Sequence, residues 1–144
     1  MTIQATYADR LALGYTGQVA DMSLSEIMSR EVETASIGFG VAVIQGAADH
    51  GCRTGAAGVF LGITVRDIAL DPTNADLYTV GDTAAIMTRG TMLVTAGEAV
   101  VAGDVVYRTA AGVLNKTATG NTLIANARWD TSAANGALAR IRLS

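Results

Sequence analysis

Apolar and polar residues alternate along most of this chain from residue 35 onward, which is the period of a half-buried β-strand. In the stretch over residues 59–68, four apolar residues share one face: Val59, Leu61, Ile63 and Val65. Thr64 and Arg66 fall on the opposite face. At the end of the chain Ile141 and Leu143 alternate with Arg140 and Arg142, so the two arginines are expected to point outward.

Turn signals separate these stretches at intervals of about 8–12 residues, a spacing typical of a β-barrel or sandwich. We expect strands over residues 37–43, 59–68, 84–88, 92–95, 105–109, 123–129 and 137–143. Arg89 and Gly90 are expected to turn the chain, and Asn135-Gly136 is a strong hairpin dipeptide before the last strand. The predicted fold is mainly β, a compact barrel or sandwich of short antiparallel strands with an extended N-terminal arm.

The N-terminal part, residues 1–34, lacks sustained alternation and is interpreted as the arm, with residues 35–144 as the body. Ser23 and Glu26 fit a capping box, which favours a short helix over residues 24–29. An irregular segment fits this stretch equally well.

Composition indicates that the protein makes contact with something larger. The 144 residues are 50% hydrophobic and only 16% charged, whereas soluble domains average about 25% charged residues. The net charge is −3 and the arginines are scattered, which disfavours a nucleic-acid partner. The uncharged run over residues 34–48 is shorter than the ~20 residues that span a bilayer, so no membrane partner is expected.

Few residues have side chains that could bind a metal or act together in catalysis. Asp49, His50 and Cys52 lie together in a glycine-rich loop over residues 46–58. Zinc needs three or four ligands, and three adjacent loop residues rarely supply them. A Cys52 nucleophile would need His50 aligned as its base and a third group to orient the pair. We therefore predict no catalytic residue, no cofactor, no metal and no enzymatic activity.

Trp129 lies on the same alternating face as Leu123, and this face is expected in the core. An interface anchor is the alternative for Trp129 because tryptophan is enriched at binding hot spots. Arg140 and Arg142, on a last strand, suit an edge or a contact between subunits. The predicted oligomer interface therefore consists of Trp129, Arg140 and Arg142.

Several short motifs follow one another along the chain, over residues 17–21, 27–30, 37–43, 62–65, 81–87, 90–94, 102–107, 126–133 and 136–143. They are loose patterns of glycine and apolar residues, and their value lies in their number and order. In that order they resemble the capsid cement, or head decoration, proteins of tailed phages.

Because the single Cys52 cannot form an internal disulfide, the chain is expected to be made in a reducing cytosol, that of the host, or to assemble independently of redox state. The resemblance implies a structural virion protein on the outer surface of the head. It would bind the major capsid protein and clamp adjacent subunits as a homo-oligomer, with a trimer favoured and a dimer next. The arm residues expected to bind the capsid are Tyr15, Gly17, Val19, Asp21, Ile27, Met28 and Arg30. The alternative function is a small β-barrel module that recognises a glycan or peptide on a phage tail or cell surface.

Overall fold

The computed structural model describes residues 14–68 and 76–144. Its eleven strands are β1 (Glu26–Val32), β2 (Ile37–Gly38), β3 (Ala42–Gln45), β4 (Gly51–Arg53), β5 (Phe60–Thr64), β6 (Leu77–Tyr78), β7 (Thr83–Thr95), β8 (Val105–Arg108), β9 (Leu114–Asn115), β10 (Thr122–Trp129) and β11 (Leu138–Leu143). No helix occurs in these two ranges. The predicted mainly β class is confirmed.

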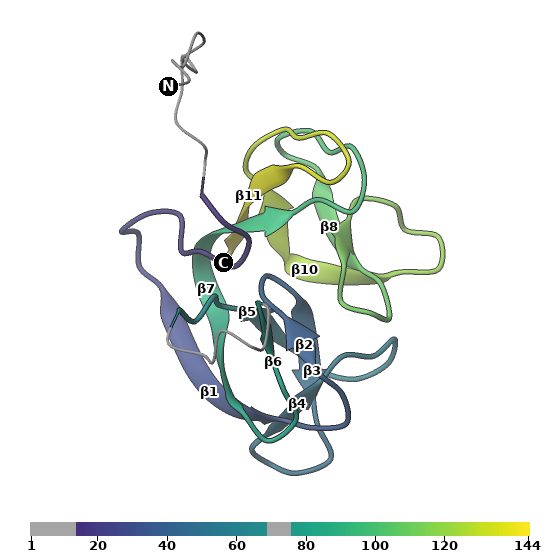
Figure 1. Cartoon of the computed structure of the whole chain (residues 1–144). Coiled ribbons are helices and arrows are strands. Elements are labelled where there is room, and N and C mark those ends of the chain that lie inside the picture. Colours follow the sequence, from purple (N-terminus) through teal and green to yellow (C-terminus); the bar gives the residue numbers. More distant parts are fainter. Residues whose placement is uncertain (1–13, 69–75) are drawn as a thin grey trace, which may run out of the picture.

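Five strands close into a barrel. They follow the order β1, β4, β3, β5 and β7, and β7 pairs back to β1. The β1–β4 pairing is parallel, and the other pairings in the barrel are antiparallel. Val43, Cys52 and Ile86 are fully buried inside it. This barrel forms the lower lobe in Figure 1.

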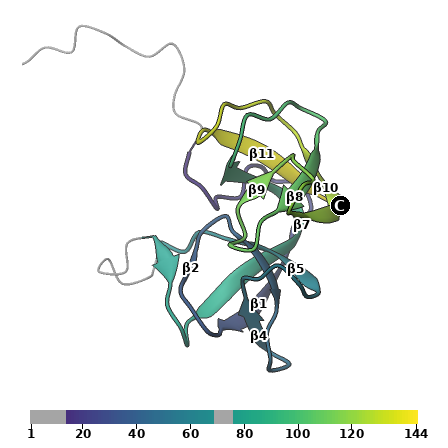
Figure 2. The same cartoon turned by 90° about the vertical axis from the view of Figure 1, so that its right-hand side faces the viewer.

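A second lobe extends the sheet from the other end of β7. β11, β10, β8 and β9 follow β7 in that order, and Figure 2 shows them above the barrel. Trp129, Ile141 and Val94 lie in the core of this lobe. A separate two-stranded sheet of β2 and β6 packs Ile37 and Tyr78 into the barrel core.

β7 runs through both lobes without a break. Its first half pairs with β1 and β5, and its second half pairs with β11. The predicted turn at Arg89 and Gly90 is wrong: Gly90 has φ +131° and the chain continues as a strand past it. A Cβ at Gly90 would lie 3.0 Å from the Ser25 Cβ, so glycine lets the N-terminal segment approach here.

The structure corrects the boundary between arm and body. Residues 26–32 form β1, so the short helix over residues 24–29 is absent and the body begins well before residue 35. Met28 is half-buried and Val32 is buried, which is the alternation of a strand. A helix of one or two turns is marginal by itself, whereas pairing with β7 closes the barrel.

Two finer predictions are also wrong. Leu123 was expected to share an inward face with Trp129, but Leu123 is 48% exposed and Ile124 is buried because the register shifts between Ile124 and Arg128. Thr64 lies on the face of β5 opposite Ile63, as the alternation indicated, yet it is buried too, and its hydroxyl donates to the Gly38 carbonyl at 2.8 Å. The loop over residues 46–58 contains strand β4.

Candidate functional site

The segment before β1 lies along the second half of β7. The Gly17 amide donates to the Leu93 carbonyl at 2.7 Å, and the Leu93 amide donates to the Gln18 carbonyl at 2.8 Å. The Ala20 amide donates to the Thr91 carbonyl at 2.9 Å. Residues 17–20 therefore extend the sheet on the side of β7 opposite β11.

Gly17 is the point of closest approach. Its φ is +81°, and a Cβ would lie 2.8 Å from the Phe39 Cβ and 3.0 Å from the Arg66 amide nitrogen. The Arg66 amide also donates to the Gly17 carbonyl at 2.7 Å. Both the left-handed backbone and the lack of space restrict this position to glycine.

Arg66 holds the segment from the barrel side. Its guanidinium carbon lies 5.2 Å from the centre of the Tyr15 ring and 4.9 Å from that of Phe39. Its Nε donates to the Thr16 carbonyl at 3.1 Å. Cation–π contacts of this kind contribute about 0.5–2 kcal/mol according to how dry the site is.

Asp21 fixes the segment to the second lobe. Its Oδ2 lies 2.5 Å from Nη2 of Arg140 on β11, and its Oδ1 accepts from the Ser23 amide and hydroxyl. These hydrogen bonds from Ser23, followed by the charges of Arg140 and Arg142, hold the pKa of Asp21 below its usual value. The segment is thus bound at both lobes.

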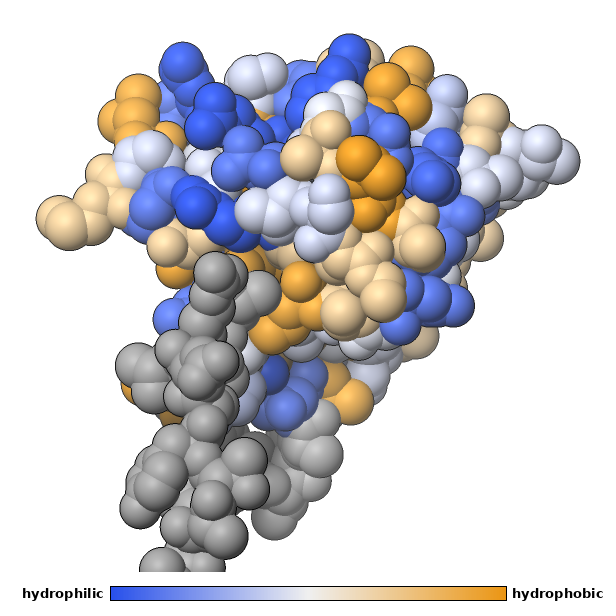
Figure 3. Space-filling model, turned by 90° about the horizontal axis from the view of Figure 1, so that it is seen from above, coloured by the Kyte–Doolittle hydropathy of each residue, from blue (hydrophilic) through white to orange (hydrophobic). Residues whose placement is uncertain are grey.

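The N-terminal segment and the start of β1 expose four large apolar side chains. We call them the N-terminal strip: Tyr15, Met22, Leu24 and Ile27, which are 68%, 103%, 69% and 48% exposed. Figure 3 shows that, in the view from above, apolar side chains form separate groups divided by polar ones. Exposed apolar side chains mark a contact surface when they form a contiguous patch, so the strip is a candidate contact surface.

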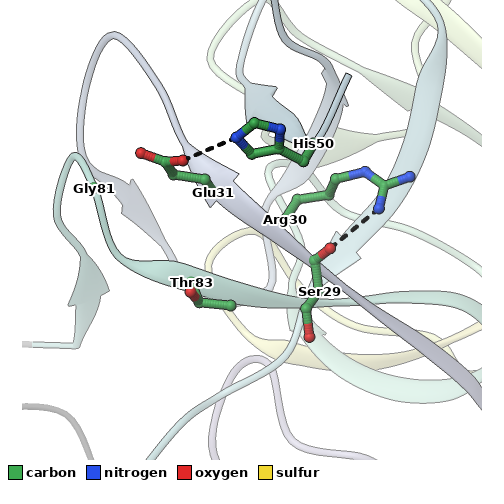
Figure 4. Close-up of a pocket in the computed structure, with 6 residues that line it drawn as sticks. All are labelled: Ser29, Arg30, Glu31, His50, Gly81 and Thr83. Carbon is green, nitrogen blue, oxygen red and sulfur yellow. Dashed lines mark hydrogen bonds and ion pairs between the residues drawn. The ribbon is translucent and has the colours of Figure 1, made fainter. Parts of the chain in front are cut away.

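The seven arm residues predicted to bind the capsid differ in their exposure, because several of them contact the body of the protein. Tyr15 and Ile27 are exposed, whereas Gly17 and Val19 are engaged with the body and Asp21 with Arg140. Met28 packs against the barrel core, and Arg30 lines a hollow with His50 (Figure 4). Met22 and Leu24, which the prediction did not include, are also exposed, and apolar residues within a non-alternating segment are a signal that the sequence offers for them.

The three residues predicted for the oligomer interface lie in different environments: one is buried and two point outward. Trp129 is 1% exposed and packs in its own core, where its Nε1 donates to the Asn115 carbonyl at 3.4 Å, so it is unavailable as an anchor. Arg140 and Arg142 project outward as predicted, and each has a nitrogen 3.7 Å from Asp130. Arg142 is the more exposed of the two.

The structure separates the side chains of His50 and Cys52 in the loop that begins at Asp49. His50 pairs with Glu31 at 3.2 Å on the surface, whereas Cys52 is buried, and burial raises the pKa of its thiol to about 11. Within the described part of the chain, no three metal-ligating side chains come together. Across residues 14–68 and 76–144 there is also no apolar helix of bilayer-spanning length.

The described residues form a closed five-stranded barrel from which a second sheet extends through β7, so the chain has an all-β fold in this part. Solved structures with a similar fold include two from phages. A chain in the capsid of Myoviridae phage XM1 is 18% identical with a TM-score of 0.77, covering 99% of this chain and 97% of that one. The N-terminal base of head fibre gp8.5 of bacteriophage phi29 is 12% identical with a TM-score of 0.55, covering 84% and 95%.

The family of structural cement proteins (E217 gp24/Pam3 gp6) matches residues 3–144. The chain belongs to this family of phage structural proteins, as its sequence motifs predicted, and is a capsid-associated component of the virion. No curated protein matches the chain.

Proposed function

We propose that this protein binds the outer surface of a phage head and stabilises the shell by clamping adjacent subunits of the major capsid protein. Its membership of the structural cement family carries the proposal. A clamp of this kind needs a rigid body and contact surfaces rather than reactive groups. Each bound copy adds a binding free energy that must be lost before neighbouring subunits separate.

The N-terminal strip is the proposed capsid contact. Met22 and Leu24 have the highest fractional exposure in the strip, and full burial of such side chains stabilises a contact by about 1.5–3 kcal/mol each. The segment is already held on the body through Gly17 and Asp21. Less conformational entropy is therefore lost on docking than for a free arm.

We further propose that the protein acts as a homo-oligomer, because several modest contacts on one shell combine by multivalency. The glycan or peptide module is not favoured. Such a site would use exposed aromatic rings, and Tyr15 is the sole aromatic among the exposed large hydrophobic residues that the structure describes.

The test uses heads that lack the cement protein and purified protein added back. Deleting residues 1–30 would remove β1 from the barrel, so substitutions are the sharper tool. Met22→Ser/Leu24→Ser should leave the fold intact and lower decoration at least tenfold, measured by co-sedimentation. The control is Val101→Ser/Leu123→Ser, which removes apolar side chains that are 56% and 48% exposed on the other lobe. Equal decoration by the two variants would refute the assignment of the strip.

A further inference from the structure

β1 has one open edge. Along residues 26–31 it pairs with β7 on one side, but on the other side it meets β4 only at Glu31 and Val32. Within the described residues, no strand pairs with the outer side of residues 26–30. An unpaired edge of this length is a template for a further strand.

The direction of the backbone groups follows from the hydrogen bonds at the end of β1. The Val32 amide donates to the Asp82 carbonyl beside β7, whereas the Glu31 amide donates to the His50 carbonyl beside β4. Because these directions alternate along a strand, Ile27 and Ser29 turn both their amide and carbonyl groups toward the open edge. Figure 4 shows Arg30 beside Ser29, whose carbonyl accepts from the Arg30 Nη1 at 3.1 Å.

The charged residues along this edge would complement those of an identical edge that runs antiparallel to it. Glu26 and Arg30 lie four residues apart on the same face, one at each end of the open stretch. Glu26 has a surface contact with Arg89 at 3.8 Å, and the Arg30 guanidinium donates to the carbonyl of its neighbour Ser29. A strand paired with this edge would let both side chains exchange these contacts for an ion pair and would free the Ser29 carbonyl for a backbone hydrogen bond.

We propose that the open edge of β1 pairs with β1 of a second copy, antiparallel and centred on Met28. In this register Ile27 of each copy lies opposite Ser29 of the other, and the two residues exchange their outward backbone hydrogen bonds. Glu26 lies opposite Arg30 at each end, where opposite charges across a strand pair are favourable. The contact is isologous and closes as a two-fold pair.

The pairing is short, and this determines its strength. From Glu31 onward the edge is occupied by His50 and β4, and before Glu26 the chain leaves strand geometry. A pairing of this length buries less than a standard interface. The dimer is therefore weak in solution and forms fully where copies are concentrated, as on a shell.

The inference sharpens the oligomer part of the proposed function, and sedimentation velocity over a range of concentrations tests it without capsids. The wild-type chain should show a two-chain species that grows with concentration. Glu26→Arg and Arg30→Glu each place like charges opposite one another twice, so each should weaken the dimer about tenfold. Glu26→Arg/Arg30→Glu restores opposite charges at both positions and should restore the dimer.

Two further variants separate edge pairing from general effects. Ser29→Pro removes an outward amide and should abolish the dimer while the thermal unfolding midpoint stays within a few degrees. Arg128→Glu changes an exposed arginine on β10 and should have no effect on the dimer.

Three results would overturn the inference: a chain that stays monomeric at all concentrations, a trimer, or a dimer that is unaffected by the charge reversals. Reduced head decoration without a change in solution mass would show that the edge takes a capsid strand instead, which also overturns it. Decoration by the wild-type chain, measured separately, decides the proposed function.

Discussion

Asp21 accepts a hydrogen bond from the guanidinium of Arg140, a residue 119 positions further along the chain. Their contact joins the end of the bound N-terminal segment to β11 of the second lobe. Sequence analysis had assigned Asp21 to the capsid and Arg140 to a subunit interface. The structure gives both residues the same role, which is to hold the segment in place.

Replacing Asp21 by Asn should release this end of the segment. Hydrogen exchange of the Ala20 amide, which donates to Thr91, should then accelerate. The folded pKa of Asp21 is depressed, so its stabilising contribution is present above the usual value of 3.8 and is lost as the pH falls through the folded value. The protection factor of wild-type Ala20 should approach that of the variant at such low pH. Equal protection in the two proteins at pH 7 would show that the pair does not hold the segment.

Gly17→Ala should destabilise the protein by about 2–4 kcal/mol, because a left-handed backbone is strained for alanine and the new methyl group meets Phe39. Gly120→Ala is the matched control. Its φ of +75° is similar to that of Gly17, but a Cβ there has no neighbour within 4 Å. Chemical denaturation should give a loss of only about 1 kcal/mol for the control. Equal losses would mean that the close approach at Gly17 costs nothing.

Arg108 joins the lobes through a buried guanidinium. It lies on β8, is 2% exposed, and its Nη1 donates to the Gly55 carbonyl at 2.5 Å. Arg108→Met keeps an unbranched apolar side chain but removes the guanidinium and leaves that carbonyl without its donor, so we expect a loss of about 1–3 kcal/mol in urea unfolding. Thr122→Val removes the more exposed hydrogen bond to Ala56 of the same loop and should cost less. The reverse order would contradict a central role for Arg108.

Cys52 should be inert toward thiol reagents in the folded protein. It is fully buried, and its pKa is raised to about 11. Labelling by a disulfide reagent at pH 8 should therefore follow unfolding, and denaturant should expose the thiol at once. Because the folded pKa exceeds the unfolded value, the contribution to stability is complete below about pH 9 and falls as the pH rises toward 11. Rapid labelling of the native protein would contradict this account.

The fold class was predictable because the body alternates with a period of two residues. In β11, Ile141 and Leu143 face inward and Arg140 and Arg142 face outward, as the pattern indicated. Elsewhere the pattern failed where the backbone departs from regular pairing. At Leu123 a register shift moves the side chain to the surface. At Gly90 a turn signal lies inside a strand because the glycine serves a close approach to Ser25.

The candidate site was less predictable. The sequence located it in the N-terminal segment but not its geometry, since contacts of Gly17 with Phe39 and of Asp21 with Arg140 join distant parts of the chain. β1 was misassigned because Ser23 and Glu26 fit a capping box, and only the partner β7 reveals the strand. Local signals cannot report a partner that lies some 60 positions away in the sequence.

The account depends most on how the protein sits on a head, and a cryo-EM map of decorated heads measures this directly. We expect Tyr15, Met22 and Leu24 to lie in contact with the major capsid protein, with the barrel bridging adjacent subunits. A map in which the N-terminal strip faces solvent, while another surface of the protein meets the shell, would contradict the central claim.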